Sequence, residues 1–177
     1  MMKNLLGIVL ILICILIYRS RYQKESILNQ KVTNNLTKAV NASTKEIASE
    51  ELTKTLTYLK SKKLTKGFTS IMWKTKNEDI GYWYENLEAS KRKLQPQKSA
   101  NRLENTLALK KLNEAIMDTG KKTRPIVPEG LAVYPNNKQW AFLMTIATLM
   151  AIIGTTILIH EADKKQSPTH SEIDLKK

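Results

Sequence analysis

The side chains that could perform acid–base or metal chemistry are few and scattered in this sequence. Its two histidines, His160 and His170, have no cysteine or second histidine at metal-ligand spacing. Carboxylates are adjacent at 50–51 and 78–79, and adjacent side chains point to different sides of a helix. We therefore predict a protein that is not an enzyme, with no catalytic residue, no metal ligand and no cofactor.

Two asparagines lie in the triplet that N-glycosylation requires. Asn35 begins Asn-Leu-Thr and Asn41 begins Asn-Ala-Ser, each with a middle residue other than proline. If used, they would place this part of the chain in a secretory lumen. The chain has 12 asparagines and many serines and threonines, so a pair of such triplets is also expected by chance.

Four lysines close together offer an anionic partner a binding surface. They are Lys60, Lys62, Lys63 and Lys66. Anionic lipid attracts such residues by about 1 kcal/mol each near a membrane surface. Lysines at a helix C-terminus also favour the helix dipole, so a solvated helix end is the simpler interpretation.

Aromatic and apolar residues alternate with lysines over residues 66–84. The apolar members are Phe68, Ile71, Met72, Trp73, Tyr82, Trp83 and Tyr84. Such a cluster can fill a core, lie on a membrane surface or stack nucleic-acid bases. We favour core packing, because Trp83 and Tyr84 fall on the apolar face of an expected helix. Nucleic-acid binding is possible in principle but not favoured, since no nucleic-acid-binding motif surrounds the cluster.

Two apolar segments, 5–18 and 140–159, bracket the chain and must position everything between them. The second has no charge over 20 residues, which gives a helix of about 30 Å, the thickness of a hydrocarbon core. The first would span only about 21 Å. Arginines and no small-residue cleavage site follow it, so we predict an uncleaved anchor over a signal peptide. Cys14 is expected to be a thiol buried in this helix.

Residues typical of a membrane interface lie beside both segments. The predicted interface anchors are Tyr18, Arg19, Arg21, Tyr22, Tyr134 and Trp140. Gly154 and several threonines in the second segment could pack against the first segment or against a second copy of the chain.

Charge predicts the orientation of the middle region. Residues 19–138 hold 24 Lys and Arg against 12 Asp and Glu, which accounts for +12 of the net charge of +13. Positive charge after the first segment favours the cytosolic side, although long loops obey this rule weakly. We expect a cytosol-facing middle, against the signal of the two sequons.

Helical spacing of apolar residues predicts four helices between the segments. We expect them at about 28–40, 43–66, 75–95 and 99–119, with capping boxes formed by Ser43 with Glu46 and by Thr75 with Glu78. Pro96 and Gly120 should end the last two. The predicted fold is all-α, with two transmembrane helices flanking a small basic helical region that ends in a proline-containing linker.

The expected organisation follows from these elements. It comprises an anchor (1–21), a helical stalk (22–66), a small helical subdomain (67–120), an extended linker (121–138), a transmembrane helix (139–160) and a disordered polar tail (161–177). The apolar faces are narrow, so we expect a homo-oligomer or contact with other membrane proteins as well as with membrane lipids.

The layout resembles that of a known group of proteins. Met-Met-Lys-Asn before the first apolar segment, the second span at 140–159 and a composition rich in Lys, Asn, Ile and Thr resemble small late membrane proteins of large cytoplasmic DNA viruses, of the African swine fever virus type. A phage or bacterial membrane protein would fit the same layout. The resemblance implies a structural or interaction component for assembly or entry, in the virion membrane and host endomembrane. The alternative is a membrane-tethered module whose basic middle binds anionic lipid, nucleic acid or an acidic protein.

Overall fold

The part of the chain that the structure describes is mostly helical. A computed structural model describes residues 2–95, 102–118 and 124–166. Within these ranges there is no strand, only two isolated bridges between Phe68 and Asp79 and between Met117 and Pro125. The all-α class is therefore confirmed. The predicted helix ends at Pro96 and Gly120, and the tail beyond Gln166, lie outside the described residues.

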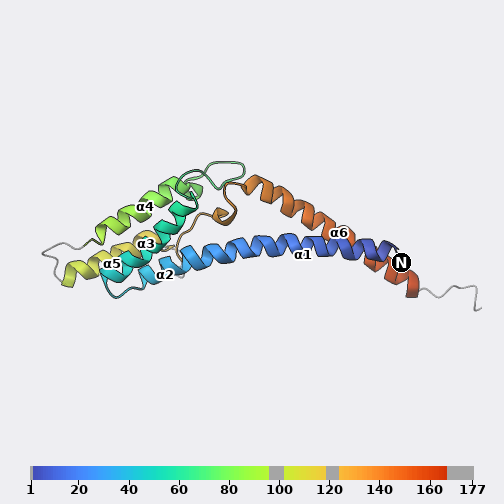
Figure 1. Cartoon of the computed structure of the whole chain (residues 1–177), viewed down its shortest axis with the longest axis horizontal. Coiled ribbons are helices and arrows are strands. Elements are labelled where there is room, and N and C mark those ends of the chain that lie inside the picture. The colour runs from blue at the N-terminus through green and yellow to red at the C-terminus, as the bar shows by residue number, and fades with distance from the viewer. Residues whose placement is uncertain (1, 96–101, 119–123, 167–177) are drawn as a thin grey trace, which may run out of the picture. The chain divides into compact units, whose positions relative to one another are not determined.

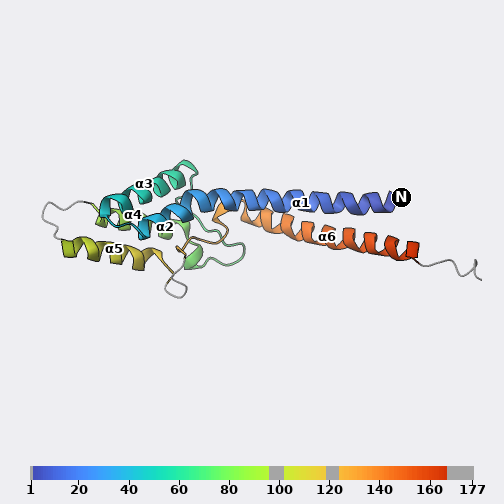
Figure 2. The same cartoon turned by 90° about the horizontal axis from the view of Figure 1, so that it is seen from below.

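The chain divides into two compact units. The first, here the hairpin unit, contains Met1–Tyr22 and Lys138–Lys177, and the second, the central unit, contains Gln23–Asn137. The hairpin unit is built from α1 (Met2–Leu28) and α6 (Asn137–Gln166), which lie side by side (Figures 1 and 2). Both are long and apolar enough to cross a membrane. Residues 161–166, predicted to start the tail, continue α6 because they include no Gly or Pro.

The central unit packs its helices around one apolar core. The end of α1 continues through a π-helical turn (Asn29–Thr33) into α2 (Asn34–Val40). Beside it lie α3 (Lys45–Ser61), α4 (Ile80–Lys93) and α5 (Arg102–Ile116) (Figure 2). The core includes the fully buried residues Val32, Leu36, Leu52, Leu59 and Ile80. Residues predicted as a stalk and residues predicted as a separate subdomain thus share this core.

Two helix starts differ from the predicted capping boxes. Thr44, not Ser43, caps α3, because its backbone is extended and its Oγ1 accepts from the Ile47 amide at 3.3 Å. Asp79, not Thr75, caps α4, because its Oδ1 accepts from the Tyr82 amide at 3.0 Å. Thr75 instead bonds Glu78 across a short 3₁₀ helix, Lys76–Glu78.

The described part of the segment predicted to be an extended linker belongs to the central unit and contributes to its core. It contains a 3₁₀ helix, Leu131–Val133, whose Leu131 side chain is fully buried. The Ile126 amide donates to the Ile116 carbonyl at 2.8 Å, and the Ile126 carbonyl accepts from Trp83 Nε1 at 2.8 Å. These bonds satisfy backbone groups that the prolines leave without helical partners.

Candidate functional site

Small residues bring α1 and α6 together along one strip of the hairpin unit. A Cβ on Gly7 would lie 3.0 Å from the Gly154 carbonyl oxygen, and a Cβ on Gly154 would lie 3.0 Å from the Gly7 carbonyl oxygen. Seven residues along each helix, Cys14 and Ala147 are buried, and Cys14 Sγ donates to the Ala147 carbonyl at 2.9 Å. The two helices therefore run antiparallel with their backbones in close approach.

The strip identifies the first apolar segment as the packing partner of the second. Tyr18 Oη and Thr148 Oγ1 are 2.9 Å apart and extend the contact. Sequence reasoning named Gly154 but missed Gly7 and Ala147. The signal that could have found them is the interval of seven between small residues, which recurs in both helices.

The remaining surface of the helix pair is apolar and exposed. Only 11% of the residues in each apolar stretch are buried. Leu16, Phe142 and Ile159 are exposed by 65%, 69% and 62%. Soluble proteins rarely leave so many neighbouring apolar side chains in contact with water.

A groove of about 240 Å³ opens where the chain enters and leaves the central unit. Lys24, next to the first residue of the unit, lines it together with Tyr134, three residues before the last. Lys62, at the end of α3, and the half-buried Tyr58 complete its polar rim, and Leu131 lies in its apolar wall. Burial raises the pKa of the Tyr58 hydroxyl. The groove combines lysine side chains and the Tyr58 hydroxyl with an apolar wall, which suits an anionic group attached to an apolar body.

The four predicted lysines are all exposed but do not form one patch. Lys62 lines the groove described above, whereas Lys60 lines a separate hollow between α3 and α4 with Lys91 and Arg92. Lys63 has a left-handed backbone at the end of α3. The backbone carbonyl of Lys66 accepts a hydrogen bond from Tyr134 Oη at 3.1 Å.

The structure divides the aromatic cluster into a buried and an exposed part. Trp83 and Tyr84 are buried in the core, as the helical spacing indicated. Burial raises the pKa of Tyr84, and the hydrogen bond from its hydroxyl to Glu88 raises it further. In contrast, Ile71, Met72 and Trp73 lie in the connection between α3 and α4 and are exposed by 48%, 75% and 76%.

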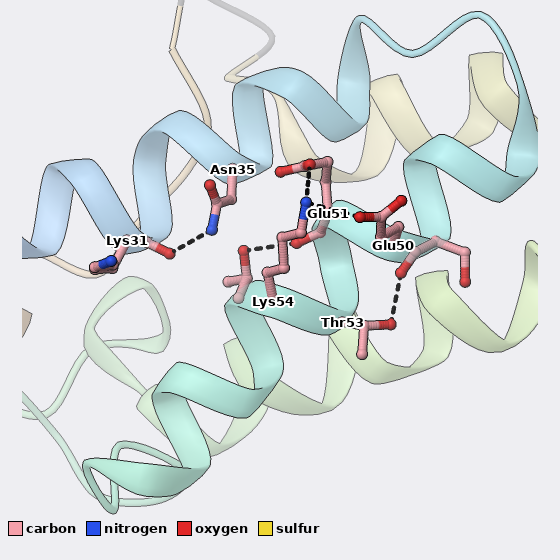
Figure 3. A network of polar contacts seen from close by, with 8 residues as sticks. Lys31, Asn35, Glu50, Glu51, Thr53 and Lys54 are labelled. Carbon is pink, nitrogen blue, oxygen red and sulfur yellow. Dashed lines mark hydrogen bonds and ion pairs between the residues drawn. The ribbon is translucent and has the colours of Figure 1, made fainter.

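A polar network on α3 stabilises the fold beside the α2 helix (Figure 3). Lys54 Nζ lies 2.6 Å from Glu51 Oε1 and 2.9 Å from Glu50 Oε1. The hydrogen bonds to Glu51 and Glu50 raise the pKa of Lys54, and the hydrogen bond to Lys54 lowers the pKa of Glu50. Glu51 is buried with one carboxylate oxygen unpartnered. The network makes an acid-sensitive contact within α3.

The two sequon asparagines have different surroundings. Asn35 is half-buried within α2, and its Nδ2 donates to the Lys31 carbonyl at 2.9 Å. Figure 3 shows Asn35 with its side chain directed toward Lys31. Asn41 is exposed and caps the C-terminus of α2, at the start of the connection to α3. Of the two, Asn41 has the surface-loop setting that a glycosylated asparagine needs.

The predicted interface anchors lie in both units. Tyr18, Arg19 and Tyr22 are exposed on α1, and Arg21 is half-buried there. Trp140 is half-buried in the first turns of α6. The remaining anchor, Tyr134, belongs to the central unit, where its hydroxyl is held by the Lys66 carbonyl.

Within the described ranges, no three His, Cys, Asp or Glu side chains gather closely enough to hold a metal ion. Comparisons with protein-family models, with curated proteins and with solved structures gave no match to this chain.

Proposed function

We propose that α1 and α6 span a membrane as an antiparallel hairpin that carries the central unit on one side. The observation that carries this proposal is the contrast between the buried small-residue strip and the exposed apolar remainder of the same two helices. In water the exposed remainder would drive aggregation, whereas in a bilayer it contacts lipid. At about 1.5 Å per residue, α1 and α6 are each longer than a hydrocarbon core of about 30 Å.

The role we propose for this anchored protein is structural or interactive and not catalytic. The central unit offers exposed lysines, a small groove and an exposed apolar loop as contact surfaces. By the resemblance in layout, the membrane would be that of a virion and of the infected host. The charge balance supports a cytosol-facing central unit, with 21 Lys and Arg against 12 Asp and Glu in residues 23–137.

A disulfide between the two apolar helices tests the hairpin. Cys14 is the only cysteine, and Ala147→Cys places a second thiol opposite it. Oxidation in intact membranes should join the two positions within one chain, detected as a cross-linked peptide by mass spectrometry. Leu149→Cys, whose side chain is 54% exposed, is the matched control and should not cross-link to Cys14. Cross-linked dimers, or release of the protein by alkaline extraction, would contradict the proposal.

The groove supports a second candidate function, the binding of anionic lipid at the membrane surface. Tyr18 is a predicted interface anchor, and Lys24 lies six residues beyond it on the same helix. The rise of about 9 Å between them is comparable with the Debye length in physiological salt, so the charge of an anionic membrane surface would still act on Lys24. Lys24 and Lys62 would then reach a lipid phosphate, and Tyr134 would lie beside it.

Lipid retention tests the groove. After extraction from mixed vesicles, the variant Lys24→Gln/Lys62→Gln should retain severalfold less phosphatidylserine than the unmodified chain, with phosphatidylcholine unchanged. Lys110→Gln/Lys111→Gln, two exposed lysines of α5, removes the same charge elsewhere and should retain the normal amount. Equal losses of phosphatidylserine in both variants would mean that net charge causes the effect, and would contradict lipid binding in the groove.

A further inference from the structure

The connection between α3 and α4 exposes three consecutive apolar side chains. Met72 and Trp73 are about three-quarters exposed, and Ile71 is nearly half exposed. Lysines lie on both sides of them within the same connection: Lys66 precedes the three residues, and Lys74 and Lys76 follow them. Apolar side chains at a loop tip gain no free energy of burial while they are in water. An aromatic residue with flanking lysines is typical of contact with a membrane interface.

The base of this loop is firmly held. The Thr69 amide donates to the Glu78 carbonyl at 3.0 Å, and the Ile80 amide donates to the Gly67 carbonyl at 2.9 Å. Gly67 has a φ of +113°, and a Cβ there would lie 2.0 Å from Tyr134 Oη. Only glycine permits this backbone and this approach. The exposed tip therefore projects from a fixed base.

The base is also tied to the end of the central unit from which α6 departs. Tyr134 Oη donates to the carbonyl of Lys66, at the start of the loop. Tyr134 precedes the first residue of α6, Asn137, by three residues, which can span at most about 11 Å. Whatever the angle between the two units, chain length keeps the loop base near the start of α6.

We propose that Ile71, Met72 and Trp73 insert into the headgroup region of the bilayer that α1 and α6 span. This inference rests on the proposed function, since it needs the hairpin to be in a membrane. Lys74 Nζ lies 5.1 Å from the centre of the Phe68 ring, and Lys76 Nζ lies 4.6 Å from the centre of the Tyr82 ring. Both ammonium groups can keep these contacts while they face lipid phosphates. The loop is then a third membrane contact that limits the tilt of the central unit.

Depth measurements on the full chain in lipid nanodiscs test the insertion. In a Cys14→Ala background, Met72→Cys, Leu103→Cys and Ile152→Cys each receive an environment-sensitive fluorophore. Leu103 is as exposed as Met72 but belongs to α5, at the opposite end of the central unit from the loop (Figure 1). Ile152 is an exposed residue of α6 and reports whether that helix is in lipid.

We expect the fluorophore at position 72 to emit at shorter wavelength and to be severalfold less accessible to aqueous iodide than the one at position 103. Trp73→Cys should behave in the same way as Met72→Cys. A water-accessible probe at 72 with a shielded probe at 152 would overturn the insertion alone, whereas accessible probes at both positions would overturn the spanning hairpin. Shielding at 72 that disappears when each nanodisc holds a single chain would assign the loop to a second copy and would overturn the lipid contact.

Discussion

At the scale of single residues, members of the same aromatic and apolar cluster have different surroundings. The helical spacing of Trp83 and Tyr84 indicated burial, and both are buried. Met72 and Trp73 belong to the same cluster of aromatic and apolar residues in the sequence, but their side chains are exposed. Residue type alone cannot separate the buried pair from the exposed pair. Trp83 and Tyr84 lie on α4, which Asp79 caps, whereas Met72 and Trp73 lie in the loop before that helix. Likewise, Lys24 and Lys62 meet at one groove only through folding.

One consequence at this scale is an acid-sensitive contact at Glu50. The hydrogen bond to Lys54 lowers the pKa of Glu50 below 4.5, its value without a partner. A lowered folded-state pKa contributes stability above pH 4.5 and loses it as the pH falls through the lowered value. Glu50→Gln should therefore unfold at a slightly lower temperature than the unmodified chain at pH 7. The effect is small because both side chains are exposed and solvent screens the pair.

The difference in unfolding temperature between Glu50→Gln and the unmodified chain should shrink as the pH falls below 4.5 and the Glu50 carboxylate becomes protonated. Thermal unfolding of the full chain in detergent micelles, followed by circular dichroism from pH 7 to pH 3, measures this. In a Lys54→Met background the pH-dependent difference should vanish. If it persists there, a group other than Lys54 sets the pKa of Glu50.

At the scale of elements, periodicity predicted the helices, while their boundaries and the linker needed tertiary information. Every predicted helix has a counterpart, because apolar spacing depends only on the 3.6-residue turn. The starts of α3 and α4 were displaced because neighbouring hydroxyl and carboxylate residues all suit an N-cap. Residues 124–136 of the predicted linker form no α-helix, whereas 137–138 already belong to α6, and nothing local indicated that Leu131 enters the core.

Leu131→Ala tests whether this segment belongs to the central unit. The side chain is only 1% exposed and joins the core cluster, so its truncation should cost about 2–5 kcal/mol in the free energy of unfolding. Ile126→Ala, in the same segment but 46% exposed, should cost no more than about 0.5 kcal/mol. Chemical unfolding of the two variants in micelles gives the comparison. Equal, small losses would mean that the segment is a linker that merely lies on the surface.

At the scale of the whole molecule, each unit brings together residues from the early and the late part of the chain. In the hairpin unit, Gly7 meets Gly154 near the outer ends of α1 and α6. In the central unit, Lys24 and Tyr134 line one groove beside the points of entry and exit. Apolar length alone predicted two spans, and two spans already imply that the chain returns to its starting side. Gly7 and Gly154 add that α1 packs against α6 of the same chain, which is one of the two packing partners that the sequence allowed.

If α1 and α6 span a membrane as we propose, both termini lie on one side of it and the central unit lies on the other. With the central unit in the cytosol, as its excess of Lys and Arg favours, protease added to sealed microsomes should digest the central unit and leave tags at both termini protected. A glycosidase-sensitive shift that Asn41→Gln removes would instead place the unit in the lumen, since Asn41 is exposed and Asn35 is held within α2. Protection of only one terminal tag would contradict the hairpin itself, because an antiparallel pair of spans within one chain cannot place its two ends on different sides.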